Sequence, residues 1–397
     1  MNTSLLNTKN QEFIDKNINS DITALLLKEA KNTSSEIKEL IEQIEAKKRA
    51  EKKLPTWFSA KNIYYPNKLN IEQTSSEDTA LFKSNLLCGN SIIDLTGGFG
   101  VDCYYFSKQF KEVTHCEINR RLSAIVKHNF SVLSADNINC VQTDGITYLE
   151  NNSTEYSAVY VDPSRRNDSK GKVFMLSDCL PNIPEHIDLL FKRTRTILIK
   201  TSPLLDLSIG INELKHVKTI YCVAINNEVK ELLWLLEKEY AGSIAIETVN
   251  ISKNKQDTFN FKMKDEALHK TQYSEPLTYL FEPNAAILKS GAFNSVAEKL
   301  QIKKLHKHSH LYTSDCLIDF PGRSFYIENV LDYNSKQFKK VFKGNKANVT
   351  TRNFPDSVST IRKKLKLKDG GDSYLFFTTN CNDKKVVIIC TKVSTLS

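Results

Sequence analysis

A glycine-rich segment in the first third of the chain has the residue types of a ligand-binding loop. It follows the β-branched run SIIDL and reads Asp94-Leu95-Thr96-Gly97-Gly98-Phe99-Gly100. Glycines after a strand allow positive φ angles and let the backbone approach a ligand closely. The free N–H groups of a helix that starts at Val101 would face the same ligand. The segment therefore predicts a loop that holds a nucleotide or nucleoside.

Two carboxylates follow this loop, each after a further predicted strand. Glu117 ends the run VTHCE, 17 residues beyond Gly100, and Asp144 follows the run NINCVQ. A carboxylate in the first position can accept hydrogen bonds from both ribose hydroxyls, and Asp144 is placed to reach an adenine amino group. Each residue alone is explained more simply as a helix cap. Their order after the glycine loop favours a nucleoside site.

Two cofactors fit this arrangement. The dinucleotide fingerprint G-x-G-x-x-G is only partly present, because Gly98 and Gly100 match it but Cys103 stands at the third glycine. Asp94, three residues before the first glycine, suits a cationic amino-acid group better than a phosphate. We therefore expect S-adenosylmethionine (SAM), with its ammonium near Asp94, and keep a nicotinamide dinucleotide as the alternative.

A second chemical motif follows the run SAVYV and reads Asp162-Pro163-Ser164-Arg165-Arg166. Open α/β sheets bind ligands at the carboxyl ends of their strands, where this motif would lie. Asp162 could accept a hydrogen bond from a target amine, and Arg165 could stack on a base or pair with a phosphate. The simpler interpretations are a strand-ending turn and structural salt bridges.

The elements that must position these residues alternate between strand and helix. The runs SIIDL, VTHCE, NINCVQ, SAVYVD and TILIK predict five strands, with helices between them, and hence a parallel sheet covered on both faces. VKTIYCVAI and SIAIETVNIS predict two further strands, separated by a helix over EVKELLWLLEKE. Upstream, a helix capped by Ser34 or Ser35 ends at Pro55, and another starts at Ser75 or Ser76. Gln73 and these last two serines precede the first strand, and a capping box is the simpler explanation for the serines.

The C-terminal part has a weaker pattern and a strong charge. AAILKSGAFNSVAEKLQI predicts a helix interrupted at Gly291, DSVSTIRKKLKL predicts a basic helix, and SYLFFTT with KKVVIICTKV predicts a closing hairpin. Residues 321–397 hold 15 Lys and Arg against 6 Asp and Glu, so this fifth of the chain carries the whole net charge of +9. Such asymmetry indicates a polyanion-binding module, or else a solvated lysine-rich face. The residues expected to bind RNA are Arg166, Lys346, Arg352, Arg362, Lys363, Lys364 and Lys366.

Bulk properties exclude several classes of protein. The 397 residues exceed one ordinary core, and 40% hydrophobic with 25% charged residues is a globular composition. We find no apolar run near the roughly 20 residues of a membrane span and no secretory signal. Nine scattered Cys without a C-x-x-C pair predict reduced thiols and a cytoplasmic location. His306, His308 and His310 would share one face of a strand, but no carboxylate or Cys cluster accompanies them, and we expect no metal.

The glycine loop, Glu117, Asp144 and the Asp162 motif together resemble motifs I to IV of class I SAM-dependent methyltransferases, over residues of about 70–252. The sequence most resembles a bacterial family, assigned to RNA methylation, that carries a THUMP-like C-terminal domain. The phrases that carry this resemblance are EPNAAILKSGAF (282–293), HLYTSD (310–315), FPGR (320–323), TRNFP (351–355) and KLKLKDGGDSYLF (364–376). The family implies SAM as cofactor, and RNA only by analogy with true THUMP proteins.

This resemblance implies an α/β fold with a Rossmann-like seven-strand methyltransferase sheet, a helical N-terminal part and a smaller α+β THUMP-like domain. We expect a helical region over 1–82, the methyltransferase domain over 83–265, a small ferredoxin-like connecting region over 266–320 and the basic THUMP-like domain over 321–397. The expected SAM-binding residues are Asp94, Thr96, Gly97, Gly98, Phe99, Gly100, Glu117 and Asp144.

The acceptor is inferred from the second motif. Enzymes that methylate base amines usually resemble [Asp/Asn/Ser]-Pro-Pro-aromatic here, whereas this chain has Ser164 and Arg165 at the last two positions. Asp-Pro-Pro-Arg resembles the 5-methyluridine RNA enzymes, which need a Cys nucleophile after the fifth strand, but TILIK runs into Lys200-Thr201-Ser202-Pro203. We therefore expect direct transfer to a nitrogen of a tRNA or rRNA base. The expected catalytic residues are Asp162, Pro163, Ser164 and Arg165.

Three alternatives to this expectation stay open. The first is a dinucleotide-dependent oxidoreductase. The second is a non-catalytic RNA-binding protein with a relic methyltransferase core. The third is a protein acceptor, because the second motif departs from the usual pattern.

Overall fold

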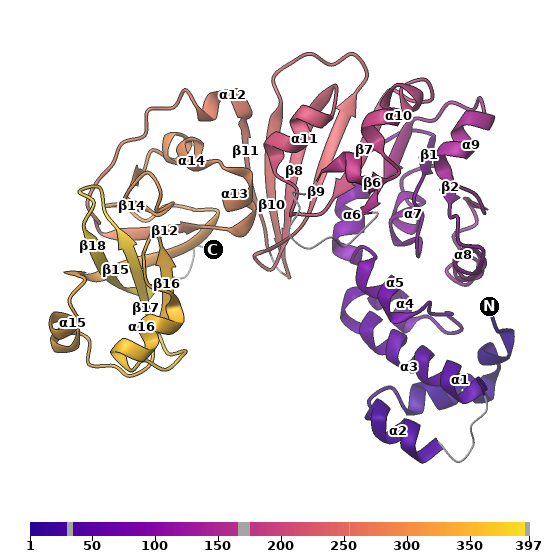
Figure 1. Ribbon diagram of the computed structural model, residues 1–397, viewed down its shortest axis with the longest axis horizontal. Coiled ribbons are helices and arrows are strands. Elements are labelled where there is room, and N and C mark those ends of the chain that lie inside the picture. The colour runs from indigo at the N-terminus through magenta and orange to yellow at the C-terminus, as the bar shows by residue number, and fades with distance from the viewer. Residues whose placement is uncertain (30–34, 166–174, 254, 394–397) are drawn as a thin grey trace. The chain divides into compact units, whose positions relative to one another are not determined.

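The computed structural model of the protein describes residues 1–29, 35–165, 175–253 and 255–393 (Figure 1). The chain separates into two compact units. The first unit contains Met1–Lys218 and Leu233–Ala241, and the second contains Thr219–Leu232 and Gly242–Ser397. The glycine loop and Asp162 belong to the first unit, and the basic C-terminal segment belongs to the second.

Helices form the N-terminal part of the first unit, as predicted. They are η1 (Thr3–Leu6), α1 (Thr8–Lys16), α2 (Ile22–Glu29), α3 (Ser35–Lys53), α4 (Pro55–Ser59), α5 (Lys68–Gln73) and α6 (Glu77–Asn85). Helix α6 begins after Ser76, whose side chain accepts a hydrogen bond from the N–H of Thr79, so this predicted cap is confirmed. The predicted end at Pro55 is also confirmed, and Pro55 itself begins α4. The alternative cap Ser34 lies outside the described residues.

The predicted parallel sheet is present in the first unit. Its five strands are β1 (Ser91–Asp94), β2 (Glu112–Cys116), β3 (Ile138–Val141), β4 (Ala158–Val161) and β7 (Thr196–Thr201). β1 pairs in parallel with β2 and β4, β2 with β3, and β4 with β7. Every residue of β4 is buried, as expected of a central parallel strand. The helices along this part of the chain are α7 (Val101–Phe106), α8 (Arg120–Val132), α9 (Gly145–Asn151), α10 (Ile183–Leu190) and α11 (Leu207–Glu213). A short pairing of β5 (Ser164–Arg165) with β6 (Cys179–Leu180), next to η3 (Leu176–Asp178), follows β4.

The helix predicted over EVKELLWLLEKE is wrong, because this segment is strand β9 (Glu228–Glu237). It follows β8 (Val217–Ile225) after a two-residue turn, Asn226-Asn227, in which both residues have positive φ. Two successive positive φ angles are the geometry of a tight hairpin turn, which Asn tolerates. Within the sheet, β9 lies between β8 and β7. Hydrogen bonding to two neighbouring strands and burial of Trp234 override the helical propensity of the leucines.

The large sheet has the strand order β11-β10-β8-β9-β7-β4-β1-β2-β3. Strand β10 (Ala245–Ser252) runs parallel to β8, and β11 (Lys255–Lys262) is antiparallel to β10. The Rossmann-like α/β class is therefore confirmed, with nine strands where seven were expected. The two strands beyond those expected are β9, inside the sheet, and β11, at the edge next to β10.

The second unit also contains a separate seven-stranded sheet of order β13-β14-β12-β15-β18-β17-β16. Its strands are β12 (Tyr279–Pro283), β13 (Lys303–Lys304), β14 (Tyr312–Ser314), β15 (Gly322–Asp332), β16 (Asn348–Arg352), β17 (Ser373–Thr379) and β18 (Lys385–Lys392). Its helices are α12 (Met263–Glu266), α13 (Ala285–Ser290), α14 (Phe293–Leu300), α15 (Ser335–Val341) and α16 (Val358–Leu365). The break at Gly291, the basic helix and the closing hairpin of β17 and β18 are confirmed.

Two clusters of buried side chains hold this second sheet in place. Phe377 of β17 packs with Phe338 of α15 and Ile361 of α16, whereas the preceding residue, Phe376, packs with Phe325 of β15. Successive residues of a strand point to opposite faces, so the sheet is covered on both sides. Because β12 pairs with β15, residues on both sides of the boundary expected at 320 share one sheet.

Candidate active site

The glycine loop connects β1 to α7 and packs tightly against β2 and α8. A Cβ atom at Gly97 would overlap the ring of His115 in β2, and one at Gly100 would overlap Phe130 in α8. Gly100 has a φ of 78° and precedes the first residue of α7. Gly98, with a φ of 55°, has only an ordinary contact at 3.7 Å on its Cβ side. Gly97 and Gly100 are therefore fixed by their close neighbours, whereas the Cβ side of Gly98 is open. A loop that receives a ligand needs such an open side.

Asp94 is a buried carboxylate at the base of this loop. One oxygen accepts the N–H of Thr96 at 2.9 Å, and the other accepts the thiol of Cys103 at 3.3 Å. Burial raises the pKa of Asp94 to about 7, and the negative charges of Asp102 and Asp162 act in the same direction. A cation beside Asp94 would favour its ionised form, so the residue suits the ammonium of an amino-acid ligand.

Glu117 lies beside the open glycine, as the sequence pattern indicated. Its two oxygens accept the N–H groups of Gly98 at 3.1 Å and Asn119 at 2.6 Å. Burial raises the pKa of Glu117 above its ordinary value. Asp144 is exposed and caps α9 by accepting the N–H of Thr147 at 2.8 Å. Its expected contact with adenine remains a prediction beside that capping role.

An apolar residue next to Glu117 was missed by the sequence analysis. Ile118 is 69% exposed, as are several single leucines of the chain. It directly follows the carboxylate expected to hold the ribose, so its side chain is available at this end of the sheet. An isoleucine between Glu117 and the polar run Asn119-Arg120-Arg121 is a signal that the sequence alone contained.

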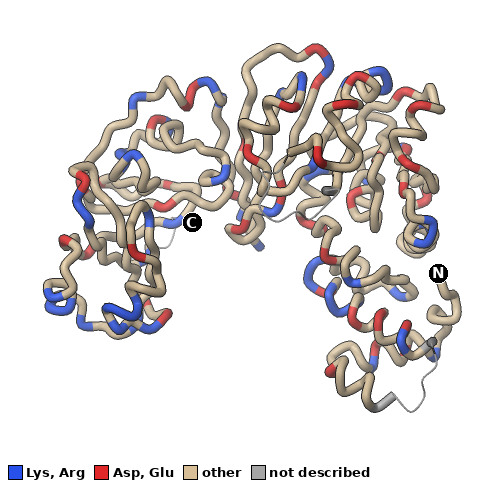
Figure 2. Tube along the Cα trace, in the orientation of Figure 1, with Lys and Arg blue, Asp and Glu red and all other residues tan. Residues whose placement is uncertain are grey.

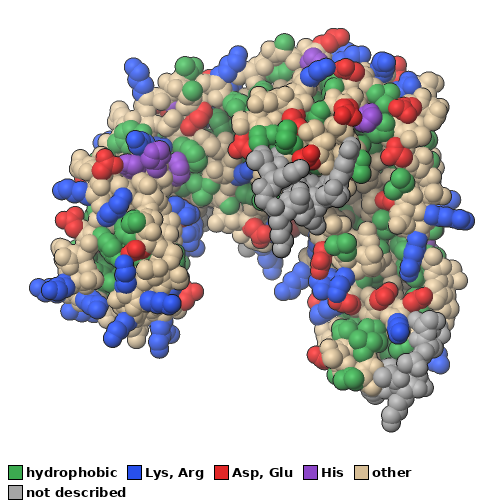
Figure 3. Space-filling model, in the orientation of Figure 1, with side chains coloured by type: hydrophobic (Ala, Val, Ile, Leu, Met, Phe, Trp, Pro, Cys, Tyr) green, Lys and Arg blue, Asp and Glu red, His purple; other side chains and the backbone are tan. Residues whose placement is uncertain are grey.

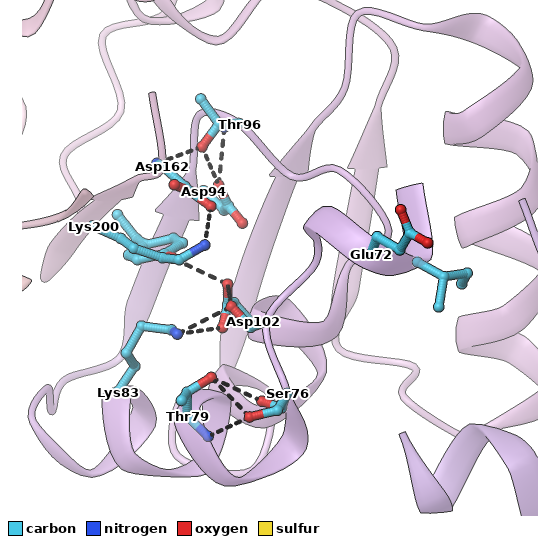
Figure 4. Close-up of polar contacts among 12 residues, drawn as sticks. Glu72, Ser76, Thr79, Lys83, Asp94, Thr96, Asp102, Asp162 and Lys200 are labelled. Atoms are coloured by element: carbon cyan, nitrogen blue, oxygen red, sulfur yellow. Dashed lines mark hydrogen bonds and ion pairs between the residues drawn. The ribbon is translucent and has the colours of Figure 1, made fainter. Parts of the chain in front are cut away.

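Asp162 is linked directly to the glycine loop. Its backbone N–H donates to the hydroxyl of Thr96 at 2.7 Å, and this hydroxyl in turn donates to Asp94 at 3.2 Å. The carboxylate of Asp162 forms an ion pair with Lys200, the last residue but one of β7 (Figure 4). The side chain of Asp162 is one-third exposed and that of Lys200 is nearly buried. The two predicted motifs are thus adjacent, and the Asp162 carboxylate already has Lys200 as a cationic partner.

A second carboxylate, Asp102 of α7, forms a buried polar network below Asp162 (Figure 4). It accepts hydrogen bonds from Ser75 at 2.8 Å and Tyr160 at 3.0 Å, and Lys83 of α6 lies 3.2 Å away. Burial opposes ionisation of Asp102, but the charges of Lys83 and Lys200 and the two hydrogen bonds outweigh it, so its pKa is lowered. Asp102, Lys83 and the role of Lys200 were not predicted from the sequence.

The ionisable groups of this region have a simple charge balance. Asp94, Asp102 and Asp162 face Lys83 and Lys200, which leaves one negative charge when all are ionised. Burial is the main cause of the raised pKa of Asp94, and no ion pair is found for Asp94 within the described part of the chain. A ligand that brings one positive charge to the loop would complete the balance.

The remaining predicted site residues have varied environments. Phe99 is buried against the ring of Trp57, so only its backbone can contact a ligand held by the loop. Pro163 is buried and Ser164 is exposed, while only the backbone of Arg165 is described, in β5. Arg166 lies outside the described residues. Gln73 is exposed at the end of α5.

The residues expected to bind RNA lie in the second unit, Arg166 apart. Lys and Arg are frequent along α15, α16 and the loops beside them (Figure 2). Lys346, Lys363 and Lys366 are exposed. Arg362 pairs with Asp369, and Lys364 pairs with Asp356 at 2.9 Å. Arg352 pairs with Glu282 at 2.8 Å, so three of the expected cations already have a carboxylate partner and the set is not equivalent.

The histidines that alternate over 306–310 lie in a turn, so the idea of a shared strand face is wrong. The reason is that His310 has a φ of 52°, which is incompatible with an extended strand. Among residues 1–29, 35–165, 175–253 and 255–393, no group of three His, Cys, Asp or Glu could hold a metal ion. No helix in those ranges is long and apolar enough to cross a membrane.

Known proteins resemble the chain at two levels. A family model described as a ferredoxin-like domain matches residues 279–321, and one described as THUMP domain-like matches residues 322–392. A crystal structure from Porphyromonas gingivalis W83, provisionally named a methyltransferase, shares 31% identity over 99% of both chains, with a TM-score of 0.89. The chain belongs to the same family. It is a class I methyltransferase-fold protein with a THUMP-like C-terminal domain.

Other solved structures in this comparison resemble only part of the chain. An rRNA methylase from Streptococcus thermophilus has 17% identity, covers 41% of this chain and 94% of its own, and has a TM-score of 0.30. A methyltransferase-like protein from Streptococcus mutans, solved with S-adenosylhomocysteine, has 15% identity, covers 41% and 96%, and has a TM-score of 0.31. At these scores neither carries an argument about this family member. No curated protein matches the chain.

Proposed function

We propose that the protein transfers a methyl group from SAM to a nitrogen of an RNA base. The observation that carries this proposal is the link from Asp162 through the Thr96 hydroxyl to Asp94. It holds the carboxylate of the second motif next to the loop that would bind the cofactor. A methyl donor and a hydrogen-bond acceptor for the target amine would then be neighbours, as direct transfer requires.

The residues present fit SAM by their chemistry. Asp94 lacks a compensating cation and could hold the methionine ammonium, and Glu117 could accept the ribose hydroxyls. The open side of Gly98 gives the backbone room to approach the ligand, and Ile118 would cover the base. When bound, SAM supplies an electrophilic methyl group on a sulfonium. The same features suit a dinucleotide less well, because a pyrophosphate would add negative charge beside Asp94.

The protein's own contribution would be alignment and charge stabilisation. Asp162 would accept one N–H of the target amine and so direct the nitrogen lone pair towards the methyl group. The amine nitrogen would take the methyl group as the bond from that methyl to the sulfonium breaks and a neutral thioether leaves. The nitrogen would then carry the positive charge, and the Asp162 carboxylate would stabilise this charge and accept the released proton. Lys200 is a positioning residue, because its ion pair fixes the Asp162 carboxylate. No cysteine nucleophile is needed for this route.

An RNA acceptor is supported by the second unit. The THUMP domain-like match covers 322–392, which is almost the whole of the segment that carries the excess positive charge. Binding of a polyanion there would bring a flexible, phosphate-rich substrate to the protein. A small-molecule acceptor would not require such a charged module.

Methyl transfer to RNA tests the proposal. Purified protein, tritiated SAM and total RNA from a strain that lacks the gene should give labelled RNA, and nucleoside mass spectrometry should identify one methylated base. Asp162→Asn should reduce transfer by about 100-fold, whereas Asp178→Asn, a variant at η3, should not. Labelled protein in place of RNA would contradict the RNA acceptor. Binding of NADH but not SAM would contradict the whole proposal.

A further inference from the structure

We propose that Arg323 and Arg352 form a binding site for a phosphate group of RNA on the second unit. This inference rests on the proposed RNA acceptor, but it concerns residues outside the methyl-transfer chemistry. Arg352 was expected from its sequence position to bind RNA, whereas Arg323 and the carboxylate that holds both side chains were not.

The two arginines are oriented by one buried carboxylate. Glu282, at the end of β12, has a side chain that is 3% exposed. One of its oxygens accepts Nε of Arg323 at 2.8 Å and a terminal nitrogen of the same guanidinium, and the other accepts a terminal nitrogen of Arg352 at 2.8 Å. Both arginine side chains are more than one-third exposed. Nη1 of Arg352 also donates to the backbone oxygen of Thr351 at 3.3 Å. Both guanidinium groups are thus held in place while part of each side chain stays exposed.

The charge of this triad is unbalanced. A single carboxylate neutralises one arginine, so the group has a net charge of +1 within its own contacts. A purely structural ion pair needs only one of the two arginines. Two rigidly held guanidinium groups around one carboxylate are instead suited to a further anion, and planar guanidinium groups match phosphate oxygens in pairs.

Four distant segments converge at this triad. The end of β12 supplies Glu282, the start of β15 supplies Arg323, and the end of β16 supplies Arg352. The next residue, Asn353, lies 3.0 Å from His306 in the turn over 306–310. A Cβ atom at Gly322 would overlap the backbone oxygen of Glu282, so a glycine is required for this approach. These segments include the phrases EPN, FPGR and TRNFP that first stood out in the sequence.

Three residues with left-handed backbone lie in the segments next to the triad. His310, Asn353 and Asp383 all have φ between 50° and 59°, a region that His, Asn and Asp adopt more often than other side chains. His306 contacts two of these residues, Asn353 and Asp383, each at 3.0 Å. These contacts connect the turn over 306–310 to the end of β16, where Arg352 lies.

The surroundings of Arg352 include other ionisable groups. Burial lowers the pKa of His310 to about 4, and the positive charges of Lys304, His308 and Arg352 act in the same direction. Histidine side chains gather at the surface of this unit in Figure 3. His308 is exposed, whereas Lys304 is buried. His310 is therefore neutral at pH 7, and the positive charge offered to a phosphodiester is that of the two arginines.

Binding of labelled RNA at several salt concentrations tests the site. The probe is fluorescein-labelled total tRNA, measured by anisotropy with the full-length protein in the absence of SAM. Arg323→Gln and Arg352→Gln should each weaken binding about fivefold and lower the slope of log K against log salt by about 0.7–0.9, the loss of one phosphate contact. The reason is that Glu282 would neutralise the remaining arginine, so each variant takes the net charge of the triad from +1 to zero. Each variant should keep its fold, because Glu282 retains the other arginine as partner. Arg323→Lys keeps the positive charge but not the forked guanidinium group, so its affinity for tRNA should lie between those of the wild type and Arg323→Gln.

Lys264→Gln, at an exposed position in α12, is the matched control and should leave the slope unchanged. Wild-type affinity and slope in both arginine variants would overturn the site, and so would a fall in melting temperature that explains all the lost binding. The proposed function fails separately. If tRNA binding depends on the two arginines but no RNA is methylated, the site stands and the acceptor is wrong. If RNA is methylated and the variants keep the wild-type KM for RNA, the acceptor stands and the site is wrong.

Discussion

Asp94 combines deep burial with a position at the base of the glycine loop, and this combination makes SAM binding sensitive to pH. Its pKa of about 7 means that it is half protonated at pH 7 and about 90% protonated at pH 6. Only the ionised carboxylate attracts the methionine ammonium. We therefore expect the Kd for SAM, measured by calorimetry, to rise about fivefold from pH 7 to pH 6.

Asp94→Asn separates this effect from that of Glu117, whose pKa is also raised. The asparagine keeps an acceptor for the N–H of Thr96 but has no charge. It should bind SAM more weakly at pH 7 and lose most of the pH dependence between 6 and 7. An unchanged pH dependence in this variant would assign the titration to another group.

The sequence shows a lysine at position 200, but its ion pair with Asp162 could not be predicted from the sequence. Its ammonium pairs with Asp162 and also lowers the pKa of Asp102 through its charge. Lys200→Met should therefore reduce kcat for methyl transfer on the order of 100-fold, with the Kd for SAM within threefold of wild type. Lys200→Arg keeps the charge and should recover part of kcat. Equal losses in kcat and in SAM affinity would show that Lys200 only supports the fold of the pocket.

The loop between β1 and α7 can be tested as an element with two distinct faces. Gly97→Ala would push a methyl group into the His115 ring and should destabilise the fold by about 1–3 kcal/mol. Gly98→Ala meets open space and should cost only about 1 kcal/mol from its positive φ, but its methyl group would occupy the ligand side. We expect Gly97→Ala mainly to lower the free energy of unfolding and Gly98→Ala mainly to weaken SAM binding. The reverse order would show that Gly98 does not face the ligand.

Helices α6 and α7 are joined by a buried ion pair that should be a strong part of the fold. Lys83 is fully buried and Asp102 nearly so. Lys83→Met would leave a buried carboxylate without its cation and should cost about 3–5 kcal/mol, whereas the double variant with Asp102→Asn should cost less than the sum of the two single changes. Urea unfolding measures both values. Because the pKa of Asp102 is lowered by folding, its contribution to stability is present above about pH 4 and is lost as the pH falls below that value.

Elements with a clear local signal were predictable, and those decided by tertiary packing were not. The strands of the parallel sheet, the Ser76 cap and the break at Gly291 follow from β-branched runs, a capping hydroxyl and a glycine at positive φ. Strand β9 has a leucine-rich composition that suits a helix equally well, and only the Asn226-Asn227 turn before it indicated a hairpin. The loop residues of the candidate site could be named from the sequence because they are contiguous. Lys83, Asp102 and Lys200 were missed because three separate elements bring them together.

At the scale of the whole chain, charge separates the two kinds of chemistry. Residues 1–320 are neutral overall, and the carboxylates of the first unit leave room for a cationic cofactor, whereas residues 321–397 carry the net charge of +9. The proposed cofactor, with its positive sulfonium, and the proposed polyanionic substrate would require opposite electrostatic environments. The distribution of charge along the chain is compatible with both, in separate segments.

This distribution predicts unequal roles for the lysines and arginines of the basic segment. Lys363 and Lys366 are exposed, and no ion pair is found for either within the described part of the chain, whereas Arg362 and Lys364 are paired with Asp369 and Asp356. A cation that already has a carboxylate partner releases fewer counterions when it meets a phosphate. The double variant Lys363→Ala with Lys366→Ala should therefore lower the salt slope of tRNA binding by about 1.4–1.8, and Lys364→Ala should change it by less than 0.5. Equal effects of paired and unpaired lysines would indicate that tRNA senses only the total charge of this unit, and the phosphate contacts would then have to be sought elsewhere on its surface.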